Sequence, residues 1–143
     1  MLVGSVINRL KTRVPALRTV EAGADLAAML KTNALPQQTP AAHVLPLRLR
    51  GGQVTSASAL FVQETDELVA VVLSFRNVDR TGASGLADMD DVKDQVIAAL
   101  AGWGPDDAAG VFRLVGGDLV HLAAGLMIYQ VELAITDQLR IPA

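Results

Sequence analysis

The stretch that decides the fold is Leu60-Phe61-Val62-Gln63-Glu64-Thr65-Asp66-Glu67-Leu68-Val69-Ala70-Val71-Val72-Leu73-Ser74-Phe75. Its second half, residues 68–75, is rich in β-branched residues and apolar on both faces, which predicts an inner strand covered on both sides. Its first half carries polar residues on both faces. We therefore expect residues 60–67 to run past the edge of the core, into solvent or against a neighbouring subunit.

Composition sets limits on the rest of the chain. With 143 residues, 51% of them hydrophobic, we expect one domain over residues 1–143. Lys+Arg 12 against Asp+Glu 15 gives a net charge of −3, which disfavours a protein that binds nucleic acid through a basic face. The chain has no cysteine, so we expect no disulfide or thiolate chemistry, and synthesis in a reducing cytoplasm.

Neither a signal peptide nor a membrane helix is predicted. The first residues, Met1 to Ser5, are followed at once by polar and basic ones, which is not the order of a signal peptide. The most apolar late run, residues 119–131, is shorter than the ~20 residues that a membrane helix requires.

The first forty residues predict two helices around a short strand. Pro15 ends the first helix, whose apolar residues recur at helical spacing at Val3, Val6, Ile7 and Leu10. Alternation over residues 17–21 predicts a strand, good helix formers over 24–31 predict a second helix, and prolines in 33–41 predict a loop.

A second strand is predicted over residues 42–50, before the long one. Leu45, Leu47 and Leu49 would share one face, and Arg48 and Arg50 the other. Pro46 cannot donate to a β-ladder, so we expect an edge strand or a bulge there. Residues 51–59, with Gly51-Gly52 and several small residues, would connect the strands as a mobile segment or an interface arm that becomes ordered against a partner.

The strongest helical pattern lies between the long strand and the closing strands. A polar turn over residues 76–85 precedes it, Gly102 ends it, and its apolar positions are Met89, Val92, Val96, Ile97 and Leu100. Ser84 or Asp88 would cap this helix. Asp88, Asp90 and Asp91 would crowd its first turn, where the helix dipole favours negative charge.

The last forty residues predict a corner and closing strands. Trp103-Gly104-Pro105 forms the corner, with the indole anchored in the core or, alternatively, serving as an interface contact. A strand is predicted over 111–115, followed by Gly116-Gly117 as a turn and by one or two closing strands over 119–122 and 126–136. Residues 138–143 would be a short C-terminal tail. Leu139 and Ile141 make it more apolar than is usual for a tail without contacts. The predicted fold class is α+β, with one mostly antiparallel or mixed sheet around a long central hairpin, backed by about three helices.

The sequence lacks required residues of the catalytic and metal-binding motifs that it partly resembles. Ser84 lacks the glycine two positions later that a nucleophile elbow needs, since Leu86 stands there. The aspartates that begin at Asp88 lack the glycine and the glutamate of a calcium loop, because Lys93 and Ala99 occupy those positions.

Histidine and glycine residues also give no site. His43 and His121 are the only histidines, too few for a zinc site without scattered carboxylates, and we expect both at strand surfaces. The two glycine pairs lack the spacing of a phosphate-binding loop. The sequence thus predicts no catalytic residue, no metal, no cofactor and no enzyme.

Several short motifs, in their order along the chain, resemble one family. They are Arg9-Leu10-Lys11, Val14-Pro15-Ala16-Leu17, Ala42-His43-Val44-Leu45-Pro46, the long valine-rich strand, Gly102-Trp103-Gly104-Pro105 and Gly116-Gly117. Over nearly its full length the chain is similar to the tail-terminator proteins of long-tailed bacteriophages, also called tail-completion or minor tail proteins.

This resemblance implies a structural virion protein, made in the host cytoplasm and assembled as a ring, usually of six copies, on the head-proximal end of the tail tube. The ring would end tube polymerisation and provide the surface that head-completion or connector proteins join. DNA would pass through the lumen without specific binding. The alternatives are another phage neck component or, from a different class, a small ligand-binding domain.

The family has no catalytic residues to carry over, so the candidate site consists of surfaces. The arginines are predicted either to pair with acidic groups of an adjacent copy or to be ordinary solvated charges. The interface candidates are Arg48, Arg50, Gln53, Leu60, Arg76, Asp79, Arg80, Asp88, Asp90, Leu139 and Ile141.

Overall fold

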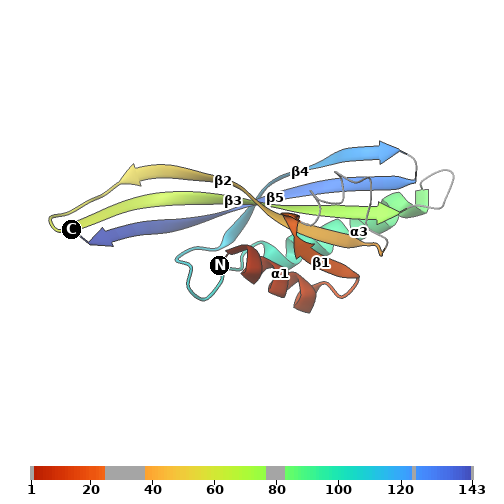
Figure 1. The fold of residues 1–143 in the computed structure, drawn as a ribbon, viewed down its shortest axis with the longest axis horizontal. Coiled ribbons are helices and arrows are strands. Elements are labelled where there is room, and N and C mark those ends of the chain that lie inside the picture. Colours follow the sequence, from red (N-terminus) through yellow and green to blue (C-terminus); the bar gives the residue numbers. More distant parts are fainter. Residues whose placement is uncertain (1, 25–37, 77–82, 124, 143) are drawn as a thin grey trace.

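A computed structural model describes residues 2–24, 38–76, 83–123 and 125–142 (Figure 1). The strands form one five-stranded sheet in the order β1-β2-β3-β5-β4, in which β1 runs parallel to β2 and the other neighbours are antiparallel. The α+β class, the mixed sheet and the long central hairpin are confirmed. In chain order the elements are α1 (Leu2–Arg13), β1 (Thr19–Ala22), β2 (Ala41–Val54), β3 (Leu60–Arg76), α3 (Ala83–Leu100), β4 (Phe112–Ala123) and β5 (Leu126–Pro142).

The described residues contain two helices, fewer than the three or so expected. The helix predicted over 24–31 falls almost wholly on residues 25–37, outside the described part of the chain. The first strand was placed two residues early, since β1 begins at Thr19. Leu17 instead closes the turn after α1, where its backbone N–H donates to the carbonyl of Val14 over 3.1 Å.

Strand β3 is the centre of the molecule. It lies between β2 and β5, and every residue from Val69 to Phe75 is at most 6% exposed. Both faces of its second half are therefore covered, as predicted. Alternate residues of a strand point to opposite faces, so Val69, Val71 and Leu73 share one face, on which α1 and α3 pack. We call this the helix-side face and the other the far face.

Both helices present an apolar stripe to the helix-side face. In α1, Val6 and Leu10 have no exposed surface, and in α3 the same is true of Val96. Trp103 packs on this core after α3 has ended, with its ring stacked on Phe112 at 6.0 Å between centroids. The indole is thus the core anchor that the sequence predicted.

Beyond the helices, three strands continue side by side as an extension of the sheet (Figure 1). We call this the three-stranded arm and define it as residues 48–54 of β2, 60–67 of β3 and 136–142 of β5. Its pairing is continuous along β3 and β5, from Leu68 opposite Ala134 to Leu60 opposite Pro142. The first half of the deciding stretch therefore runs past the core, as predicted.

Two expectations about the three-stranded arm were wrong. Gly51-Gly52 lies within β2 rather than in a connection, and residues 138–142 are strand rather than tail. In both cases the long β3 supplies backbone partners to residues whose own sequence carries only a weak strand signal. The hairpin closes over residues 55–59, where the N–H of Thr55 donates to the carbonyl of Val62 over 2.9 Å.

The irregularity expected at Pro46 is present as a register shift between Pro46 and Arg48. The shift inserts one extra residue and so reverses the faces that follow. Leu45 pairs with Ala70 on the far face, whereas Leu49 pairs with Glu67 on the helix-side face. The expectation that Leu45, Leu47 and Leu49 share one face was therefore wrong.

Strand β4 runs straight through Gly116-Gly117, which was predicted as a turn between two strands. Register shifts on either side, at 114/116 and 119/121, absorb the irregularity. The glycines have a packing reason, because a Cβ on Gly117 would lie 2.7 Å from the hydroxyl oxygen of Tyr129. Glycine leaves room for that ring across the strand.

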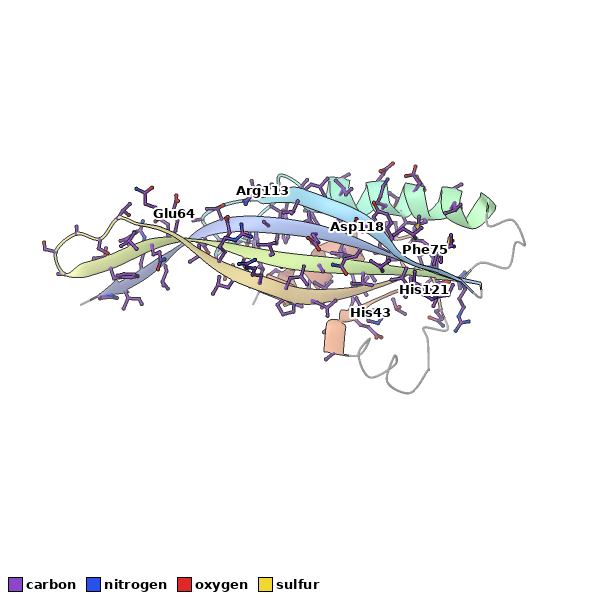
Figure 2. All side chains as sticks on the ribbon, turned by 90° about the horizontal axis from the view of Figure 1, so that it is seen from above. His43, Glu64, Phe75, Arg113, Asp118 and His121 are labelled. Atoms are coloured by element: carbon purple, nitrogen blue, oxygen red, sulfur yellow. The ribbon has the colours of Figure 1, made fainter. Side chains whose placement is uncertain are left out.

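Two further corrections concern charged and titratable groups. Helix α3 begins at Ala83, so its first turn holds no acidic residue, and Asp88, Asp90 and Asp91 lie further along it. His43 is buried, with 1% of its surface exposed, because its strand is covered on the far face as well. Its Nε2 lies 3.8 Å from the carboxylate of Glu21 on the neighbouring β1. His121 is exposed, as expected (Figure 2).

Candidate assembly surfaces

The helix-side face of the three-stranded arm carries exposed apolar side chains beside the polar Gln63, Thr65 and Glu67. Phe61 and Ile141 pair directly across β3 and β5, and Leu139 follows opposite Gln63. Leu49 and Val54 of β2 share this face, opposite Glu67 and Gln63. We call this set the apolar arm face; its exposed fractions are Leu49 68%, Val54 51%, Phe61 38%, Leu139 42% and Ile141 50%.

The far face of the three-stranded arm is charged. Arg48 and Arg50 are exposed on it, and Arg140 donates from Nη2 to the side-chain carbonyl of Gln138 over 2.8 Å. The three-stranded arm therefore has two different faces. The far face carries charged side chains, whereas the helix-side face carries apolar side chains whose exposure to water is unfavourable.

A small polar network holds the base of the three-stranded arm to the body. Asp66 on β3 accepts a 2.6 Å hydrogen bond from the hydroxyl of Thr136 on β5. Its carboxylate also forms an ion pair with Nη2 of Arg113 on β4, at 3.1 Å. Arg113 also donates from Nη1 to the Thr136 hydroxyl over 3.1 Å. The network joins three strands near the first residues of β4, where the three-stranded arm begins (Figure 2).

This geometry stabilises the ionised form of Asp66. The hydrogen bond from Thr136, and then those from Arg113, hold the pKa of the Asp66 carboxyl below its ordinary value of about 4. A depressed carboxyl pKa stabilises the folded state above the pKa of the unfolded chain, and this contribution is lost as the pH falls through the folded-state pKa.

An Asp66→Asn variant should therefore lose stability at neutral pH but not in acid. We expect a loss of about 0.5–1 kcal/mol in the free energy of unfolding at pH 7, a small value because Arg113 is half exposed. The difference from wild type should shrink as the pH falls below about 4 and vanish below the folded-state pKa of Asp66. Urea unfolding at pH 7 and pH 3 measures it.

Glu64→Gln is the matched control for this experiment. Glu64 is exposed on the same strand and the same face, two residues from Asp66, and its substitution should change stability little at either pH. A loss in Asp66→Asn that is equal at both pH values would contradict the role given to the carboxylate.

A second uncovered apolar surface lies on β4, which is an edge strand of the sheet. Leu114, Leu119 and Leu122 pair with Leu133, Tyr129 and Met127 and so share the helix-side face. Val115 and Val120 sit at the two register shifts. We call these five residues the β4 row; their exposed fractions are Leu114 47%, Val115 50%, Leu119 44%, Val120 54% and Leu122 56%.

The predicted interface residues separate into two groups at opposite ends of the sheet. Arg48, Arg50, Gln53, Leu60, Leu139 and Ile141 lie on the three-stranded arm. Arg76, Asp88 and Asp90 lie at the other end, where β3 ends and α3 begins. Asp79 and Arg80 lie outside the described residues.

Arg76 and Asp88 are brought together in a depression of about 370 Å³, which Arg18 and Asp91 also line. Asp90 is instead engaged within its own helix, where its carboxylate lies 2.6 Å from Nζ of Lys93. That contact raises the pKa of the half-buried Lys93 ammonium above its usual range.

Sequence reasoning missed three members of the apolar arm face and the whole β4 row. Phe61 and Val54 stand among polar residues, and the bulge at Pro46 hides the face of Leu49. The β4 row carried a signal in its apolar residues on both sides of Gly116-Gly117. Interpreting those glycines as a turn broke the row into two short strands.

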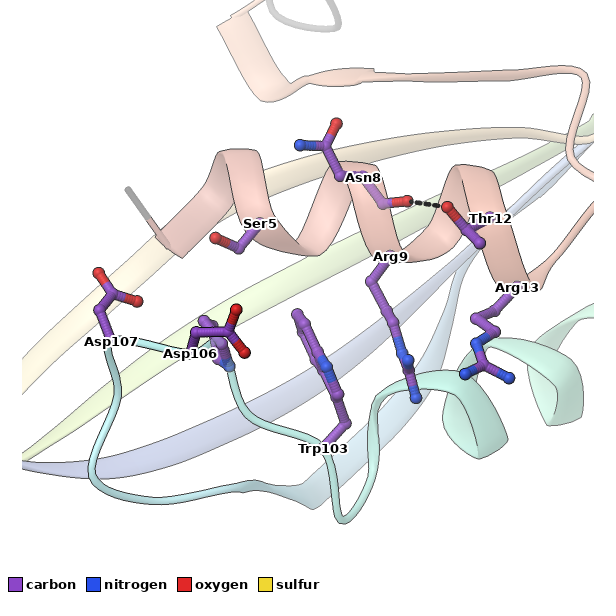
Figure 3. Close-up of a pocket in the computed structure, with 9 residues that line it drawn as sticks. Ser5, Asn8, Arg9, Thr12, Arg13, Trp103, Asp106 and Asp107 are labelled. Atoms are coloured by element: carbon purple, nitrogen blue, oxygen red, sulfur yellow. Dashed lines mark hydrogen bonds between the residues drawn. The ribbon is translucent and has the colours of Figure 1, made fainter.

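A depression of about 520 Å³ lies between α1 and the segment after α3 (Figure 3). Polar and charged side chains dominate its lining. Arg9 holds the two walls together, with Nε donating to the carbonyl of Ala99 over 2.9 Å and the guanidinium 5.0 Å from the centre of the Trp103 ring. A small-molecule site is typically enclosed and mostly apolar, so this depression gives the ligand-binding alternative little support.

The described part of the chain offers no cluster of three or more histidine or acidic side chains able to hold a metal ion. None of the described helices is long and apolar enough to cross a membrane. The described residues do carry two exposed apolar surfaces at different places on one sheet.

The model of the phage tail terminator protein family matches residues 1–141. The chain belongs to that family. It is therefore a structural phage tail protein, a component of the virion, from a family that is not one of enzymes. A search of curated proteins found no match.

Proposed function

We propose that this tail terminator family member assembles as a closed ring, with six copies as the expected number, on the head-proximal end of the tail tube. There it ends tube polymerisation and provides the surface that head-completion or connector proteins join. The observation that carries the proposal is the three-stranded arm, whose apolar face stays 38–68% exposed in a single chain. Apolar surface of this kind is typical of a subunit that is completed by others.

The charges of the chain are compatible with a lumen for DNA. A net charge of −3 gives no reason for tight binding of phosphates, which basic residues would supply. DNA passing through the ring would then slide without specific contacts. The predicted interface residues at the two ends of the sheet, arginines on the three-stranded arm and Asp88 and Asp90 on α3, serve as candidates for contacts between copies.

The test is to add the purified protein to growing tubes of the cognate tail tube protein and to measure tube lengths by electron microscopy. We expect density at one end only and no further growth from that end. Oligomer mass on and off the tube gives the number of copies.

Two other outcomes would overturn the proposal. If capped and uncapped ends elongate equally, the protein is not a terminator in function. If it binds isolated connector proteins but never the tube, it is a neck component instead.

A further inference from the structure

Because the proposed ring needs a contact that repeats from copy to copy, we searched the described surface for two complementary patches on one chain. We propose that the apolar arm face of one copy packs on the β4 row of the next copy. This inference rests on the proposed function and names its interface.

Both surfaces carry apolar side chains that are exposed in the single chain. Each consists of five large apolar side chains, and all ten are between 38% and 68% exposed. Packing one surface on the other would remove both sets of apolar side chains from water, which is favourable.

The two surfaces also have the same length. On the apolar arm face, the distance from Phe61 to Glu67, the residue opposite Leu49, is six residue steps along β3. On the β4 row, the partners of Leu122 and Leu114 are Met127 and Leu133, again six steps along β5. At 3.3 Å per residue, each surface is about 20 Å long.

The two surfaces differ from each other and lie at different parts of the sheet (Figure 1). A patch that binds itself gives a two-fold dimer, whereas two different complementary patches give a head-to-tail contact. Such a contact repeats, and it closes into a ring when its rotation divides a full turn. One chain supplies everything the repeat needs.

The strand edges are less suited than the sheet faces to a contact between copies. Strand β4 carries two register shifts and the outer part of β2 carries two more. Bulges of this kind hinder the addition of another strand to an edge. The apolar side chains remain available, so a contact through faces is favoured over extension of the sheet.

The absence of cysteine from the natural sequence makes a clean test possible. Leu139→Cys and Leu119→Cys are made separately in chains with different tags and mixed in the assembled state, with tail tubes present, before treatment with a short bismaleimide. Because each chain has one thiol, every mixed product joins two copies. Arg140→Cys with Leu119→Cys is the matched control, since residue 140 is next in the strand but on the far face.

We expect mixed products for the Leu139→Cys and Leu119→Cys pair and their loss for the control pair. In a second measurement, both thiols should react with a monofunctional maleimide in the free chain and lose that reactivity in the assembly, while the thiol of Arg140→Cys stays reactive.

If wild-type rings form on the tube but the Leu139→Cys and Leu119→Cys pair gives no mixed product and no protection, this interface is wrong and the proposed function stands. Products joining only Leu139→Cys to itself would mean that arms pack on arms, which also overturns the inference. If wild-type protein forms no ring, with or without tubes, both proposals fall.

Discussion

A Phe61→Glu, Ile141→Lys double variant should fold normally and fail to assemble or to cap tail tubes. The two residues pair directly across β3 and β5 on the apolar arm face. An opposite-charge pair at directly opposed positions keeps the strands together. One added acid and one added base leave the net charge at −3. The substitution therefore removes the apolar surface and little else.

The expected effect is large because every contact in a ring carries the same change. Losing two partly exposed anchors removes about 2–3 kcal/mol from each contact, which corresponds to about a 100-fold weaker association at each one. Sedimentation gives the oligomer mass, electron microscopy gives the fraction of capped tubes, and urea unfolding checks that the stability is retained.

Val62→Gln is the control for this variant. Val62 lies between Phe61 and Gln63 on the same strand but faces the other side of the three-stranded arm, opposite Arg140. It should cap tubes like wild type. If the double variant also capped tubes like wild type, the apolar arm face would have no part in assembly.

The largest effect on stability is expected from Phe112→Ala. Phe112 is 2% exposed, and its ring stacks on Trp103, over which the guanidinium of Arg9 lies. Its backbone is tied as well, because its N–H donates to the carbonyl of Trp103 and its own carbonyl accepts from Gly102, both over 2.8 Å. One side chain thus joins β4 to the end of α3 and to α1.

Removing this ring should cost about 3–5 kcal/mol, the lost transfer free energy plus the cavity left behind. A domain of this size is stable by only about 5–15 kcal/mol, so the melting temperature should fall by about 10 °C or more. Urea and thermal unfolding of the free chain measure both quantities.

Phe112→Leu, which fills most of the space, should lose clearly less, and Leu139→Ala, at an exposed position, should change stability by less than about 0.5 kcal/mol. A loss below about 1 kcal/mol for Phe112→Ala would mean that the corner relaxes around the missing ring.

The patterns that the sequence predicted correctly are those that a short window contains. The stripe of α1, the apolar run at Val69 to Phe75 and the irregularity at Pro46 depend on side-chain period, β-propensity and a missing donor. These act within a few residues and need no partner to be recognised. The projecting first half of β3 was predicted for the same reason, because polar residues on both faces at 63–67 cannot lie in a core.

Several errors came from residues whose state depends on a distant partner. Gly51-Gly52 and Gly116-Gly117 favour turns by themselves, yet pairing with β3 and β5 makes them strand. His43 was expected at the surface because its neighbours in sequence do not show that the far face is covered. Helix α3 also begins earlier than predicted, at Ala83, so Asp88, Asp90 and Asp91 lie beyond its first turn.

The amino-acid sequence alone thus determined the fold class, the long central strand and the family, because these follow from local periodicity and from short motifs in a fixed order. Tertiary structure alone decided which exposed residues form a surface. Phe61, Leu139 and Ile141 share a face only through the register of β3 and β5, and a shift of one residue would turn them to opposite sides. Register is set by the whole sheet, so no single stretch of sequence contains it.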